Sequence, residues 1–309
     1  MTRRRAGLTA VTLALALGAC STPVDPEEAG NPPSSSTSRS SDATTSSSVR
    51  SPSASGTPAR LDAALVRDLE TVRRAHPEAE IAVALTPVGS SARPRVVGDP
   101  EPLVAWSTIK VPLALAVERS VAAQGDPTPT AGTATDPEAD IEAALTVSDN
   151  AAAERLWQHL GAGSRAATAV EDQLRRGGDE RTDVPPEVTV PGFSAFGQAR
   201  WRLRDQARFT AALPCLAGSD PVTDAMGRVA GGQAWGLAGI DGVRSKGGWG
   251  STPQGYVVRQ LAILPGAKGE TAAAVQVRTG THEQGTRIMD EVAQVLWRHR
   301  ERLPVGSCG

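Results

Sequence analysis

The run WSTIKVPLALAV at residues 106–117 is the starting point for interpreting this 309-residue chain. Pro112 is tolerated best in the first turn of a helix, so a helix should begin within a few residues of Ser107. The run that follows is apolar on every face, which predicts a helix buried inside a domain. Ser107 and Lys110 are three positions apart, so their side chains share one helix face. Burial and the positive helix end lower the pKa of an amine, and a neutral lysine beside a serine is a general base beside a nucleophile.

The rarity of lysine strengthens this interpretation. Among 32 basic residues only Lys110, Lys246 and Lys268 are lysines. Arginine provides surface charge but cannot give up its proton in a protein. A lysine kept in such a chain therefore suggests a compact or titratable amine, although Lys268, in PGAKG, is typical of a turn.

The amino terminus predicts export. Arginines at 3–5, an apolar run at 8–17 and the tetrapeptide LGAC, which ends at Cys20, form a signal peptide that resembles the bacterial lipobox, in which the cysteine is lipidated. An ordinary secretory signal with an incidental cysteine is the alternative. Residues 21–60 are rich in Ser, Thr and Pro and cannot bury enough surface to offset chain entropy. We therefore expect a lipoprotein signal peptide at 1–20, a disordered tether at 21–60, and a folded domain at 61–309 outside the cytoplasm, anchored to the cell membrane.

Charge and cysteine content limit the partners. A net charge of −2 gives no sign of a nucleic-acid partner. No histidine forms a zinc-type pair, so we expect no metal and no cofactor, and the chain is expected to be a monomer. Cys215 and Cys308 remain after Cys20, and an even pair in an exported protein is expected to form a disulfide.

Hydrophobic periodicity outlines the folded part. Strands at both ends with helices between them predict an α+β fold, an α/β sandwich in which both chain ends form one antiparallel sheet with flanking helices and an all-helical domain is inserted. Residues 177–196 form a long irregular loop, and loops of that length tend to be functional. We expect helices at 59–75, 107–124, 138–147, 151–160, 166–176, 204–213 and 283–302, and strands at 81–85, 94–97, 243–247, 256–264 and 272–278.

Three short motifs occur in one order. They are STIK at 107–110, SDN at 148–150 and KGG at 246–248. Together they resemble the signatures S-x-x-K, S-D-N and K-T-G of the class A β-lactamases and penicillin-binding proteins, the penicillin-recognising serine hydrolases. The resemblance covers essentially the whole region from 60 to 309.

The resemblance implies a role for each motif residue. Ser107 would be the acylated nucleophile, with Lys110 as its amine partner. Ser148 would relay a proton to the leaving group, and Asn150 would hold the substrate amide. Lys246 would present a positive charge to a substrate carboxylate, next to Gly248, and the backbone N–H groups of Ser107 and Trp249 would form the oxyanion hole.

Two positions depart from the family pattern. Gly247 replaces a hydroxyl residue, which removes one contact to the substrate carboxylate. Class A β-lactamases also use a loop glutamate to activate the deacylating water, and Glu187 lies at about that place in the chain. The Leu-Asn pair that follows this glutamate in the family is absent here, so a solvated loop carboxylate is the alternative interpretation of Glu187.

The sequence thus predicts a serine hydrolase that forms an acyl-serine intermediate with β-lactams or related cell-wall peptide amides. Two alternatives stay open: a D-alanyl-D-alanine carboxypeptidase-type penicillin-binding protein with slow deacylation, and a non-catalytic lipoprotein that binds cell-wall fragments. A classical Ser-His-Asp hydrolase is disfavoured because the chain has no G-x-S-x-G elbow. The expected substrate is a small molecule or a peptidoglycan fragment.

Overall fold

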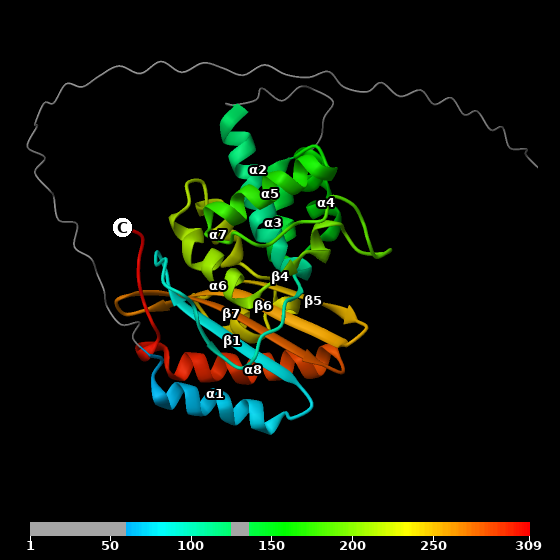
Figure 1. The fold of residues 1–309 in the computed structure, drawn as a ribbon. Helices are drawn as coiled ribbons and strands as arrows, with labels where there is room; N and C mark the ends of the chain where they lie inside the picture. The colour runs from blue at the N-terminus through cyan, green and yellow to red at the C-terminus, as the bar shows by residue number, and fades with distance from the viewer. Residues whose placement is uncertain (1–59, 125–135) are drawn as a thin grey trace, which may run out of the picture. The chain divides into compact units, whose positions relative to one another are not determined.

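The computed structural model describes residues 60–124 and 136–309. The predicted signal peptide with Cys20, and nearly all of the predicted tether, lie outside the described residues. The described part is built on a five-stranded sheet, shown in Figure 1, in which every neighbouring pair is antiparallel. The strands lie in the order β2 (Arg95–Val97), β1 (Glu80–Pro87), β7 (Gly269–Thr279), β6 (Gly255–Gly266) and β5 (Arg244–Thr252).

Residues from both ends of the domain therefore share one sheet, as predicted. Strand β1 pairs along its whole length with β7, from Glu80 opposite Arg278 to Pro87 opposite Thr271. Helices α1 (Ala63–Ala75) and α8 (His282–Arg298) cover one face of the sheet, and the other α-helices lie on the opposite face (Figure 1). The α+β fold expected from the order of elements is confirmed.

Alternation along β1 explains why both faces are covered. Ile81, Val83 and Leu85 belong to the apolar cluster that includes the buried residues of α1 and α8. Ala82 and Ala84 point the other way and pack with residues of α6 (Leu203–Ala212). Successive side chains of a strand point to opposite faces, so a strand covered on both sides has apolar residues at nearly every position.

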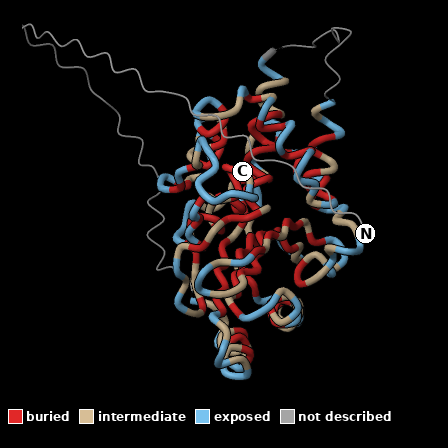
Figure 2. Tube along the Cα trace, turned by 90° about the vertical axis from the view of Figure 1, so that its right-hand side faces the viewer, coloured by how far each residue is buried: buried red, intermediate tan, exposed pale blue. Residues whose placement is uncertain are grey.

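The helical part is organised around α2 (Lys110–Gln124). Every residue from Lys110 to Val117 is buried, which confirms the prediction of a buried helix. Figure 2 shows the buried residues of the described chain in red. A short 3-10 helix, η1 (Trp106–Ile109), precedes it, so the helix opens with a tight turn at the expected place. Its neighbours are α3 (Pro137–Thr146), α4 (Asn150–His159), α5 (Gly163–Arg176) and α7 (Asp220–Met226).

The disulfide and the long loop occur where the sequence predicts them, whereas some strands differ. Cys215 and Cys308 form the predicted disulfide, with Cα atoms 5.3 Å apart. The segment after α5 contains no helix or strand until η2 (Phe196–Gln198), as predicted. The strand expected at 243–247 is longer, Arg244–Thr252, and the short pair β3 (Leu103–Val104) and β4 (Arg200–Trp201) was not predicted. In the described ranges no helix is both long and apolar enough to span a bilayer.

Candidate active site

Ser107 lies on the strained turn that opens the central helix. The residue before it, Trp106, has a φ of +49°, a left-handed conformation that non-glycine residues seldom adopt. The Trp106 ring packs edge-on against Phe193 at 5.0 Å between centroids, and Gly250 of β5 leaves room for it, because a Cβ there would lie 2.6 Å from the ring. This packing holds the turn in place. Ser107 is half-buried and lies on the wall of a cavity of about 610 Å³.

Lys110 also lines this cavity, and its amine is directed at the SDN turn. The side chain is only 1% exposed. Its Nζ donates to the backbone oxygen of Ser148 at 2.6 Å, to Oδ1 of Asn150 at 2.8 Å and to the backbone oxygen of Asp149 at 3.2 Å. Burial lowers the pKa of Lys110 to about 8, against an opposing effect of the Asp149 carboxylate. A substantial fraction of this amine is therefore neutral near physiological pH.

The second lysine reaches the same turn from the sheet. Lys246 on β5 is 1% exposed, and its Nζ donates to Oγ of Ser148 at 2.8 Å and to the backbone oxygen of Gly247 at 2.7 Å. Burial, followed by repulsion from Lys110, lowers the pKa of Lys246 well below its usual value. Oγ of Ser148 also lies 3.4 Å from Nζ of Lys110, so this hydroxyl lies between the two amines. Ser148 itself has a φ of +58°.

The local sequence explains how the SDN turn is held. Asp149 caps α4, because its Oδ1 accepts a hydrogen bond from the backbone N–H of Ala152 at 2.7 Å. Asn150 is the first residue of that helix, and its side chain lines the cavity together with Ser107 and Lys110. The first two motifs therefore meet at one cavity wall. Lys246 does not line the cavity and contacts the site through Ser148.

Gly248 brings the third motif against the turn that contains Ser107. A Cβ at this position would lie 2.8 Å from the backbone nitrogen of Ser107, 2.9 Å from that of Thr108 and 3.0 Å from the backbone oxygen of Ala105. Only glycine allows β5 to pass this close to the turn. β5 is an edge strand, so only one of its edges pairs, with β6, and Trp249 follows Gly248 on the cavity wall.

One contact expected from the sequence is not made directly. In residues 60–124 and 136–309, no hydrogen bond joins Nζ of Lys110 to Oγ of Ser107; the amine is engaged with the SDN turn instead. Catalytic hydrogen bonds are often long before substrate binds and tighten in the reactive complex. The shared cavity wall and the spacing of three residues keep the two groups neighbours.

Of the two glutamates near the site in sequence or space, only one is on the cavity wall. Glu187 is exposed and does not line the cavity, whereas the next residue, Val188, does. The carboxylate on the wall is Glu154 of α4, whose Oε1 accepts from Nε2 of Gln158 at 2.8 Å. Glu154 lies four residues after Asn150 and hence on the same helix face, a spacing that could have identified it from the sequence.

The loop that forms one wall of the cavity is held by hydrogen bonds to one side chain, that of Gln198. Oε1 of Gln198 accepts from the backbone N–H groups of Thr189 at 3.2 Å and Val190 at 2.7 Å, and its Nε2 donates to the backbone oxygen of Ser194 at 3.1 Å. The loop residues on the cavity wall are Val188, Gly192, Phe193 and Ser194. Phe193 joins this loop to the body of the domain through its ring contact with Trp106.

A buried arginine that the sequence analysis did not identify supports the turn that contains Ser107. Arg259 of β6 is fully buried and donates to the backbone oxygens of Leu103 at 2.9 Å and Trp201 at 3.1 Å, and to Oε1 of Gln206 at 2.8 Å. Nε2 of Gln206 in turn donates to Oγ1 of Thr108 at 3.0 Å. Burial lowers the pKa of Arg259 to about 9. This network ties the sheet to the residue that follows Ser107.

Comparisons with known proteins bear on the fold. No family model and no curated protein sequence matches the chain. Solved structures do match. A class A β-lactamase from Mycobacterium abscessus has 18% identity and a TM-score of 0.59 over 76% of this chain and 98% of its own. A β-lactamase from Burkholderia vietnamiensis has 19% identity and a TM-score of 0.58 over 77% and 97%. The TLA-3 extended-spectrum β-lactamase has 15% identity and a TM-score of 0.59 over 76% and 98%.

These identities show a shared fold. The chain has the β-lactamase-like α+β architecture, which confirms at the level of the fold the resemblance expected from its three motifs.

Proposed function

We propose that the chain is a serine hydrolase that forms an acyl intermediate on Ser107 with β-lactams or related cell-wall peptide amides. The observation that carries the proposal is the placement of Lys110. Its buried amine, with a pKa lowered to about 8, lies on the wall of a cavity shared with Ser107 and Asn150 and within 3.4 Å of the Ser148 hydroxyl. A base and a hydroxyl on one cavity wall, with a second hydroxyl next to the base as a proton relay, are the elements of acyl transfer.

The geometry suggests how the proton would travel. Neutral Lys110 takes the proton of the Ser107 hydroxyl as its Oγ attacks the carbonyl carbon of the substrate amide. The C–N bond then breaks, and the proton passes from Lys110 through Oγ of Ser148 to the leaving nitrogen. The buried Lys246 amine, 2.8 Å from that oxygen, orients the hydroxyl. Water finally hydrolyses the serine ester and returns Ser107 to its free form.

A penicillin-binding type of enzyme with slow deacylation is the second candidate. Its support is the exposure of Glu187, which leaves the loop glutamate away from the cavity wall. Fast deacylation needs a base that activates a water next to the ester. Glu154 is exposed as well, but it is the carboxylate on the cavity wall. The two candidate bases therefore predict opposite effects of substitution. In a β-lactamase that uses the wall carboxylate, Glu154→Gln slows turnover and traps the acyl-enzyme, whereas Glu187→Gln does not.

Intact mass spectrometry with a penicillin and turnover of a chromogenic cephalosporin test the proposal. The expected result is an adduct that is absent from Ser107→Ala and unchanged in Ser91→Ala, a control at an exposed serine. Turnover lost in Ser107→Ala supports a β-lactamase, and a stable adduct without turnover supports the slow-deacylating type. Absence of both adduct and turnover in the wild-type protein would refute acyl transfer and favour a cell-wall-binding lipoprotein.

We also propose that the protein is lipidated on Cys20 and anchored to the outer face of the cell membrane. The signal-like sequence at 1–20 and the Cys215–Cys308 disulfide support this, because disulfides persist in oxidising compartments. Membrane fractionation tests it. Wild-type protein should sediment with membranes, and Cys20→Ala should release it to the soluble fraction; a soluble wild-type protein would contradict lipidation.

A further inference from the structure

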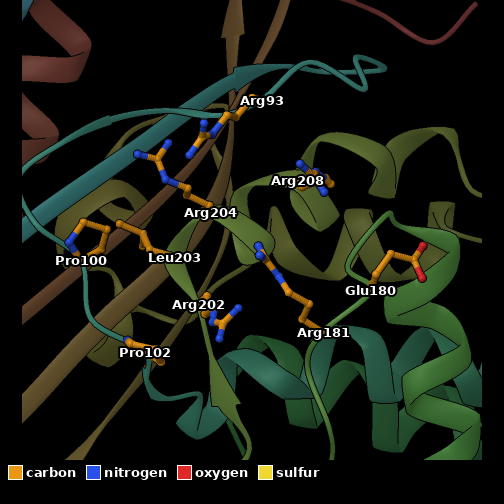
Figure 3. A pocket seen from close by; sticks show the side chains of 9 residues that line it. All are labelled: Arg93, Pro100, Pro102, Glu180, Arg181, Arg202, Leu203, Arg204 and Arg208. Carbon is orange, nitrogen blue, oxygen red and sulfur yellow. The ribbon is translucent and has the colours of Figure 1, made fainter.

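A second cavity, of about 540 Å³, is lined by nine residues, five of which are arginines. It shares no lining residue with the cavity that contains Ser107. Figure 3 shows its charged residues, which come from three separate parts of the chain: the β1–β2 connection, the segment after α5, and α6 with the residue before it. They are Arg93, Glu180, Arg181, Arg202, Arg204 and Arg208.

Most of these guanidinium groups lack a counter-charge. Of the five arginines at this cavity, only Arg181 forms an ion pair within the described ranges, at 2.6 Å to Asp205. The single carboxylate on the cavity wall is that of Glu180. Arg204 and Arg208 are four residues apart on α6, where like charges repel each other. Arg93 lies beside Arg204 in Figure 3, and burial together with Arg93 lowers the pKa of Arg204. The fold therefore holds five arginines at this cavity beside only two carboxylates, those of Asp205 and Glu180.

The head groups are also fixed by the protein backbone. Nη1 of Arg204 donates to the backbone oxygen of Pro94 at 2.7 Å, and Nη1 of Arg208 donates to that of Gly178 at 3.3 Å. Nε of Arg208 is buried without a hydrogen-bond partner. Leu203, the first residue of α6, lines the cavity, and Arg202 provides no side-chain cap to this ten-residue helix. The open N–H groups of a helix start add a further preference for an anion.

We propose that this cavity is a binding site for a phosphate-type oxyanion. Guanidinium groups bind carboxylates and phosphates through paired hydrogen bonds. A planar carboxylate directs its two oxygens into one plane, whereas a tetrahedral phosphate directs oxygens toward several walls at once. Arginines that reach the cavity from three parts of the chain suit the second geometry. The phosphate could belong to a soluble phosphate ester or to a lipid headgroup, and the two sources are separated by experiment.

Binding of pyrophosphate to the full chain, followed by calorimetry at low salt, is the first test. Arg202 is exposed, and its side chain makes no hydrogen bond or ion pair in the described structure, so Arg202→Gln should leave the fold intact. We expect this variant, and Arg204→Gln, each to lose roughly tenfold in affinity. Arg165→Gln, which removes an exposed arginine of α5, should bind like the wild type. Acylation of Ser107 should be unchanged in Arg202→Gln, so this test is independent of the proposed catalysis.

Vesicle sedimentation identifies the source of the phosphate. Binding of phosphatidylglycerol vesicles, but not phosphatidylcholine vesicles, that is lost in Arg202→Gln would assign the site to a lipid headgroup. Pyrophosphate binding without vesicle binding would assign it to a soluble phosphate ester. The proposal is overturned if neither probe binds the wild-type protein. It is equally overturned if Arg165→Gln weakens pyrophosphate binding as much as Arg202→Gln does, because the effect would then be one of general surface charge.

Discussion

If the amine of Lys110 deprotonates Ser107, the rate of acylation should follow the titration of that amine. With a pKa of about 8, a fraction of roughly one tenth is neutral at pH 7, half at pH 8 and nine tenths at pH 9. An unperturbed lysine would be neutral in only about one molecule in three thousand at pH 7. The second-order rate constant for acylation should therefore rise about fivefold from pH 7 to pH 8. It should level off above pH 9, near tenfold its value at pH 7.

The assay is adduct formation on Ser107 with a penicillin between pH 6 and 9.5, followed by quenched-flow mass spectrometry. Ser107→Ala measured in the same buffers controls for alkaline opening of the lactam. Lys110→Arg keeps a positive charge that cannot titrate in this range, so its acylation should be slower by roughly a thousandfold or more and lack the inflection. A wild-type rate that is flat from pH 6 to 9, or that still climbs steeply past pH 9.5, would refute the role given to Lys110.

Three further outcomes test the packing. Gly248→Ala should destabilise the fold by about 1–3 kcal/mol and slow acylation, because its Cβ would lie 2.8 Å from the backbone nitrogen of Ser107. The control is Gly231→Ala, where a Cβ would meet no atom within 4 Å. This control should change neither the thermal unfolding midpoint nor the acylation rate. Arg259→Met should cost about 1–3 kcal/mol of unfolding free energy in urea, because the backbone oxygens of Leu103 and Trp201 lose their guanidinium donor. A loss under about 1 kcal/mol would contradict this. Replacing both disulfide cysteines by alanine should lower the unfolding free energy by about 4–5 kcal/mol, because the bridge restricts an unfolded loop with a sequence separation of 93 residues. An unchanged urea midpoint would show that the bridge adds no stability.

The sequence was most informative where chemistry and local structure coincide. The S-x-x-K spacing placed a hydroxyl and an amine on one helix start, and the two groups do line one cavity. The SDN turn was expected between two helices, and Asp149 does cap α4 there. Apolar periodicity predicted the sheet strands β1, β6 and β7, because their faces are set by neighbours that repeat along the strand.

The parts that were missed depend on contacts between distant segments. Arg259 and Gln260 interrupt an apolar run in the way that solvent-facing residues do, yet both are buried because β6 lies inside the sheet and is covered on both faces. The second cavity, with its five arginines, is lined by residues between Arg93 and Arg208, and no local sequence pattern predicts that these residues meet. Glu187 was selected by its place in a loop, but the exposure of a loop carboxylate depends on how the loop packs.

The pairing of β1 with β7 has a consequence for how the molecule is assembled. Glu80 has no strand partner on that side until Arg278 has been synthesised, so nearly the whole domain must leave the ribosome before the middle of the sheet can form. Chains in which such distant segments must find each other fold slowly and expose apolar strands meanwhile. A nascent copy of this protein should therefore depend on holding chaperones far more than its mature size would suggest.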